Sequence, residues 1–165
     1  MAQIKIHLQS RYILMVLLLG SLMTATTGCK RNLVDFSMET PKRQWFYRNH
    51  VVTKFEIKDH KKAYNIYFKL RHTGDYRYAN IFVLVHFIDG NQKVTKRYQY
   101  KLAENDGKWL GSGSGNIFNY TLPMLTNYRF THNGKYSIDV EQNMRDNPLK
   151  EITDVGILVE EAGER

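Results

Sequence analysis

The chain has 165 residues, a formal net charge of +8 and a single cysteine. One cysteine cannot form an internal disulfide, and its position behind a leader (below) excludes a redox or thiol-catalysis function. The basic balance would suit a nucleic-acid-binding protein, but export argues against that class. The charge instead fits anionic lipid headgroups or acidic envelope polymers, or it simply keeps a β-protein soluble.

Residues 1–28 have the organisation of a secretory signal peptide. A basic segment, residues 1–11, precedes an apolar run over 12–19 that is too short to span a bilayer. A small residue before a lone cysteine is typical of a bacterial lipoprotein leader. We therefore predict cleavage before Cys29 and its lipidation, although Thr26 stands where the usual motif prefers Leu or Val. The alternative is an ordinary secreted protein with a cysteine there by chance.

The segment after the leader divides into a tether and one domain. Residues 29–42 contain few apolar side chains and end near Pro41, so we expect a lipidated flexible tether. Residues 43–165 have the length of one compact domain that can bury its own core.

Alternation of apolar and polar residues predicts β-strands throughout this domain. Residues 81–88 are apolar almost throughout, which predicts a central strand covered on both faces. We interpret residues 144–150 as irregular, with room for one helical turn. The other expected strands are 51–57, 64–71, 94–102, 117–120, 128–130, 136–140 and 155–159. About eight short strands predict an all-β fold, an antiparallel β-sandwich of jelly-roll type.

Motifs for catalysis or cofactor binding are missing from the sequence. No two histidines have metal-ligand spacing, and His86, in the most apolar segment, is expected to be buried and bonded to a backbone group. The glycines of 111–115 lack the residues of a P-loop or a dinucleotide fingerprint, and no GxSxG elbow occurs. We predict no catalytic residue, no cofactor and no metal, and hence no enzyme.

Two groups of residues are candidates for a special role. Trp109 beside the glycine-rich loop is either a plug over the end of the sandwich, which we favour, or an exposed recognition residue. With Gly111, Gly113 and Arg145 it forms the candidate partner surface. An arginine at a strand end commonly pairs with a carboxylate. We therefore expect Arg71 or Arg145 to pair with Asp154 and fix the C-terminal loop.

Three blocks of sequence, in order behind the leader, resemble a known family. They are Leu70–Thr73 followed by Tyr76–Ile81, Gly107–Gly115, and Gln142–Leu149 followed by Asp154–Ile157. Together they resemble the gliding motility lipoprotein GldH family. The resemblance implies an envelope lipoprotein associated with the gliding machinery and the linked secretion apparatus, without catalytic residues or cofactor. Basic Lys30 and Arg31 favour a periplasm-facing location.

We arrive at three functional hypotheses. The first is a lipid-anchored, non-enzymatic scaffold for a membrane protein complex, with the membrane and other envelope proteins as partners and no nucleic acid. The second is a carbohydrate- or peptidoglycan-binding sandwich with Trp109, Tyr76 and Tyr78 as the stacking platform. The third is a hydrolase, which would need polar groups such as His72 and Arg71 to converge in a cleft with carboxylates.

Overall fold

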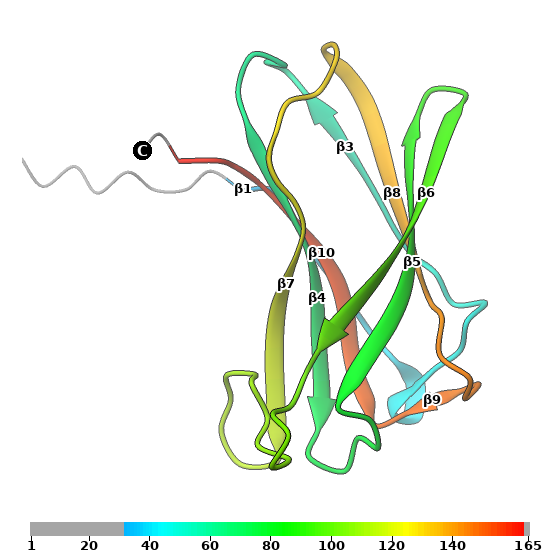
Figure 1. The fold of residues 1–165 in the computed structure, drawn as a ribbon. Helices are drawn as coiled ribbons and strands as arrows, with labels where there is room; N and C mark the ends of the chain where they lie inside the picture. Colours follow the sequence, from blue (N-terminus) through cyan, green and yellow to red (C-terminus); the bar gives the residue numbers. More distant parts are fainter. Residues whose placement is uncertain (1–31, 164–165) are drawn as a thin grey trace, which may run out of the picture.

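The computed structural model describes residues 32–163, which form two antiparallel four-stranded sheets packed face to face (Figure 1). The first sheet contains, in spatial order, β1 (Asn32–Glu39), β10 (Ile152–Glu161), β4 (Tyr64–Thr73) and β7 (Ile117–Tyr128). The second contains β3 (Val51–Ile57), β8 (Gly134–Gln142), β5 (Asn80–Asp89) and β6 (Gln92–Lys101). A 3-10 turn, η2 (Pro41–Arg43), and a short ladder of β2 (Gln44–Trp45) with β9 (Leu149–Lys150) complete the described elements.

The strand pairing is nested along the chain. β5 pairs with β6, β4 with β7, β3 with β8 and β1 with β10, all antiparallel. The described chain is thus one long hairpin rolled into two sheets, which is the organisation of a jelly roll. The predicted all-β sandwich is confirmed.

Alternation in the sequence builds the core between the sheets. Every second residue of β3, from Val51 to Ile57, is buried, and the residues between them are exposed. Ile66 and Phe68 of β4 have no exposed surface and face the same core. Burying a side chain such as Phe68 stabilises the fold by about 2–3 kcal/mol. The predicted alternation therefore positions the core residues in both sheets.

The predicted tether is wrong from residue 32 onward. Residues 32–39 form β1, in which Phe36 lies opposite Ile157 of β10. Leu33, Val34 and Met38 are partly buried against the core. An edge strand needs only a few apolar residues, so low apolar density did not reveal it. β1 begins three residues after Cys29, which lies with the leader outside the described residues.

Two other segments differ from the prediction. Residues 144–148 form no helical turn, because the buried Gln142 side chain accepts the Met144 N–H and donates to the Asp146 carbonyl. β7 is one strand rather than two pieces. Pro123 is compatible with it because β7 is the edge of its sheet, where a missing N–H can face away from the ladder.

The molecule has two distinct ends. At the N-terminal end lie Asn32, the β3–β4 turn (58–63) and the β7–β8 turn (129–133), as the pairing of Tyr64 with Tyr128 requires (Figure 1). At the far end lie the loops 74–79, 102–116 and 143–148. Ten-residue β4 runs between them, which separates the two ends by about 30 Å. Within residues 32–163, no helix is long and apolar enough to cross a membrane.

Candidate functional site

Trp109 closes the core at the far end. The indole is half-buried, and its ring lies edge-on against His72 with ring centroids 4.5 Å apart. Phe118 and Tyr76 contact it at 5.8 Å and 6.3 Å. Such aromatic contacts stabilise beyond the area they bury. The arrangement agrees with the plug interpretation of Trp109.

His72 forms the centre of this aromatic group. Its side chain is fully buried, and Nδ1 donates to the Thr73 carbonyl oxygen, 2.7 Å away. The rings of Tyr76, Phe118 and Tyr120 lie around it at 5.0–5.8 Å. Burial lowers the pKa of His72 below its ordinary value of 6.5, and the bond to Thr73 opposes this only in part. His72 is therefore a neutral core residue at neutral pH.

The two predicted glycines allow the far-end loop to lie directly on β7. The Ser112 and Asn119 backbones exchange hydrogen bonds of 3.0 and 2.7 Å. A Cβ added at Gly113 would lie 1.9 Å from the Ile117 carbonyl oxygen, and one added at Gly111 would lie 2.6 Å from the Tyr120 ring. Only glycine permits this approach. Residues 112–116 are exposed.

Arg71 is the arginine that pairs with Asp154. Its Nη1 lies 3.3 Å from Asp154 Oδ2, and its Nε donates to Asn119 Oδ1 over 2.8 Å. Asn119 in turn donates to the Ser112 carbonyl. Asp154 lies opposite Arg71 within β10, so the pair joins three strands to the glycine loop rather than fixing a C-terminal loop.

Arg145 takes a different position from Arg71. It is exposed in the far-end loop 143–148 and lies near Tyr78. A hydrogen bond to Asp146 raises the pKa of Tyr78, and the positive charges of Arg77 and Arg145 oppose this only in part. The fold therefore places the whole candidate partner surface at the far end of the sandwich: Trp109, Gly111, Gly113 and Arg145. A role for this end in partner binding stays a prediction.

A cluster on the outer face of the second sheet was not found from the sequence. His50 Nδ1 lies 2.8 Å from Asp139 Oδ1, and His50 Nε2 lies 3.0 Å from Glu141 Oε2. Buried His86 contacts the Thr95 hydroxyl at 2.8 Å and Glu141 at 3.4 Å. The expected backbone bond of His86 is thus replaced by side-chain contacts. Across residues 32–163, no three His, Cys, Asp or Glu side chains are arranged to hold a metal ion.

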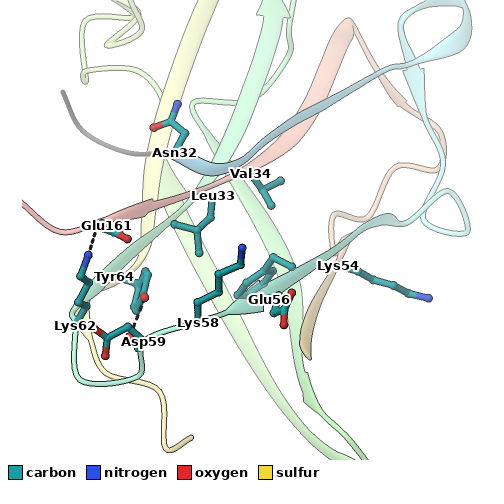
Figure 2. Close-up of a pocket in the computed structure, with 11 residues that line it drawn as sticks. Asn32, Leu33, Val34, Lys54, Glu56, Lys58, Asp59, Lys62, Tyr64 and Glu161 are labelled. Carbon is teal, nitrogen blue, oxygen red and sulfur yellow. Dashed lines mark hydrogen bonds and ion pairs between the residues drawn. The ribbon is translucent and has the colours of Figure 1, made fainter. Parts of the chain in front are cut away.

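A cleft lies at the opposite, N-terminal end, between β1 and β3 (Figure 2). Its volume is about 460 Å³. Leu33 and Val34 from β1 and buried Phe55 and Tyr64 supply its apolar lining. The lining also includes six charged side chains: Lys54, Glu56, Lys58, Asp59, Lys62 and Glu161.

Comparison with known proteins identifies the family. The model of the GldH lipoprotein family matches residues 33–159, from the second residue of β1 into β10. This chain belongs to the GldH lipoprotein family. The resemblance noted from the three sequence blocks is confirmed, and the family match spans both sheets of the sandwich.

Two relatives of the GldH family are similar over most of their length. A gliding motility lipoprotein GldH homolog of Christiangramia forsetii is 30% identical over 128 residues, covering 72% of this chain and 78% of that protein. The gliding motility lipoprotein GldH of Flavobacterium johnsoniae is 26% identical over 155 residues, covering 88% and 94%.

Among solved structures, the VP2 subviral particle of infectious bursal disease virus aligns with a TM-score of 0.35 and 12% identity over 80% of this chain. The structure of the Gx strain of that virus aligns with a TM-score of 0.31. The chain spans about a third of the length of these viral chains, 32% and 31%.

Proposed function

We propose that this GldH-family protein is a lipid-anchored, non-enzymatic component of the cell envelope. It serves gliding motility and the linked secretion machinery by scaffolding or stabilising a membrane protein complex. The observation that carries the proposal is the family match across the whole sandwich, together with relatives named as gliding motility lipoproteins. The lipid is on Cys29, and the domain faces the periplasm.

The fold gives this anchor a defined consequence. A lipid at Cys29 holds the N-terminal end of the sandwich at the membrane, because β1 begins three residues later. The far end then stands about 30 Å further out. Anchoring confines the domain to the membrane surface and raises its effective concentration for membrane-bound partners. The exposed glycine loop and Arg145 are the docking surface for those partners.

The geometry gives less support to the carbohydrate-binding alternative. Tyr76 is 4% exposed, and its hydroxyl donates to the Asn80 carbonyl. The Tyr76 ring is inclined by 69° to that of Tyr78 and by 43° to that of Trp109. Stacking on a sugar requires exposed rings in a row, and this trio lacks that arrangement.

The hydrolase alternative is also weakly supported. A general base must reach substrate through a cleft. His72 is fully buried within aromatic rings, and its ring nitrogens contact the Thr73 carbonyl and the Tyr120 hydroxyl. These contacts support a structural role for His72.

Affinity purification from cross-linked membranes tests the scaffold proposal. We compare a tagged wild-type copy, a Cys29→Ala copy, and a copy with Ser114→Tyr and Arg145→Glu at the far end. We expect a defined set of envelope proteins with wild type, and loss of that set in both variants. Lys93→Glu, at an exposed position of β6, is the matched surface control. An identical set with all four copies would contradict the proposal.

A further inference from the structure

We propose that the cleft at the N-terminal end is a binding site for the headgroup of phosphatidylethanolamine in the membrane that holds the anchor. Lys58 binds the lipid phosphate, and Glu56 accepts hydrogen bonds from the lipid ammonium. This inference rests on the lipid at Cys29 in the proposed function and adds a second, reversible contact with the same membrane.

The position of the cleft supplies the first argument. Asn32, Leu33 and Val34, the first residues of β1, form one wall. The three residues from Cys29 to Asn32 span at most about 11 Å when extended. The cleft is therefore held within reach of the lipid surface, and the occupant that it meets at the highest concentration is a membrane lipid.

The lining of the cleft has the mixed character of a bilayer interface. Its volume of about 460 Å³ lies within the range of small-molecule sites. Leu33 and Tyr64 supply apolar surface, whereas Lys58 and Glu56 lie at the margin and are exposed (Figure 2). Such a surface contacts the glycerol region and the headgroup together.

The charges of the cleft select a zwitterionic headgroup. Lys62 Nζ is paired with Glu161 Oε2 at 2.9 Å. Glu161, by its hydrogen bond and its charge, and Asp59, by its charge, raise the pKa of Lys62, so the Asp59 carboxylate belongs to the same charged group, and its Oδ1 also accepts the Lys61 N–H. Lys54 extends away from the cleft in Figure 2.

Two charges of the lining then remain outside the group formed by Lys62, Glu161 and Asp59. In the described part of the chain, neither Lys58 nor Glu56 takes part in an ion pair (Figure 2). Lys58, the first residue after β3, extends toward Leu33 and Val34 of β1. One free ammonium and one free carboxylate match the phosphate and the primary amine of phosphatidylethanolamine. Phosphatidylcholine has the same phosphate but no N–H to donate.

The test uses a short-chain soluble lipid and the mature chain with Cys29→Ser. The described strands of both sheets lie within residues 32–163, so this chain retains the core that they form. NMR titration with dihexanoyl-phosphatidylethanolamine should shift the signals of Leu33, Lys58 and Tyr64. Lys58→Gln should weaken binding about tenfold, the cost of a charge-assisted hydrogen bond. Glu56→Gln should abolish the preference for phosphatidylethanolamine over dihexanoyl-phosphatidylcholine.

The matched control is Lys108→Gln, which removes an exposed lysine at the far end and should leave binding unchanged. Equal affinity for both lipids in wild type, unaffected by Lys58→Gln, would overturn the proposal, as would the absence of shifts at the cleft. The assay contains neither anchor nor protein partner, so its failure leaves the scaffold proposal intact. Failure of the membrane purification, conversely, leaves the headgroup site intact.

Discussion

Trp109→Ala separates a structural plug from a recognition residue. Complete burial makes an aromatic-to-alanine substitution cost about 3–5 kcal/mol. Trp109 is half-buried, but it contacts His72, Tyr76 and Phe118. We therefore expect the free energy of unfolding to fall by about 2 kcal/mol. In a domain of this size, that corresponds to a decrease in Tm of about 6–10 °C.

The assay is urea denaturation of the mature Cys29→Ser chain followed by far-UV circular dichroism. Leu110→Ala is the neighbouring control, because Leu110 is 49% exposed and lies outside the hydrophobic core. We expect this substitution to cost less than about 0.5 kcal/mol. Trp109→Phe should recover roughly half of the loss by restoring ring contacts. If Trp109→Ala is as neutral as Leu110→Ala, the plug interpretation is refuted and Trp109 becomes a surface residue.

Three further predictions follow from the same end of the molecule. Because burial lowers the pKa of His72, the unfolded chain takes up a proton at higher pH than the folded chain. The contribution of His72 to stability is therefore complete above pH 6.5 and decreases as the pH falls below it. In a series of denaturation experiments from pH 8 to 5, His72→Phe should flatten this dependence, and an unchanged slope would contradict the assignment to His72. Gly113→Ala should destabilise by about 1–3 kcal/mol because its Cβ meets the Ile117 carbonyl, whereas Gly163→Ala, with open space around it, should be neutral; equal melting temperatures would disprove the close approach. Arg71→Ala should cost only about 0.2–1 kcal/mol, since the Arg71 side chain is 50% exposed, and a larger loss would show that the pair with Asp154 is stronger than its exposure suggests.

The sandwich was predictable because most of its strands carry a strong period-two pattern. β3, β4 and β8 bury alternate residues along most of their length, which is the signal that alternation measures, whereas β10 buries three residues in succession at 155–157. β1 was missed because it is an edge strand whose residues are mostly exposed or half-buried. β2 and β9 have two residues each, which is too short for any periodicity.

The candidate sites also differ in how much of them the sequence predicts. The shape of the glycine-rich loop and the partial burial of Trp109 could be predicted from local composition. Glycine permits a close backbone approach, and a large aromatic ring tends to be buried. The contacts of His50 with Asp139 and Glu141 depend on the pairing of β3 with β8, which no local pattern reveals. The cleft at the N-terminal end likewise depends on β1 lying beside β3. It could not be predicted, because the residues of β1 that form one of its walls were interpreted as part of a flexible tether.

Mass spectrometry of the N-terminal peptide, purified from membranes of a strain producing the protein, tests the central claim most directly. We expect a chain that begins at Cys29, carries a diacylglyceryl group on the sulfur and is recovered in the membrane fraction. An exported chain with an unmodified thiol at position 29, recovered in the soluble fraction, would contradict the claim.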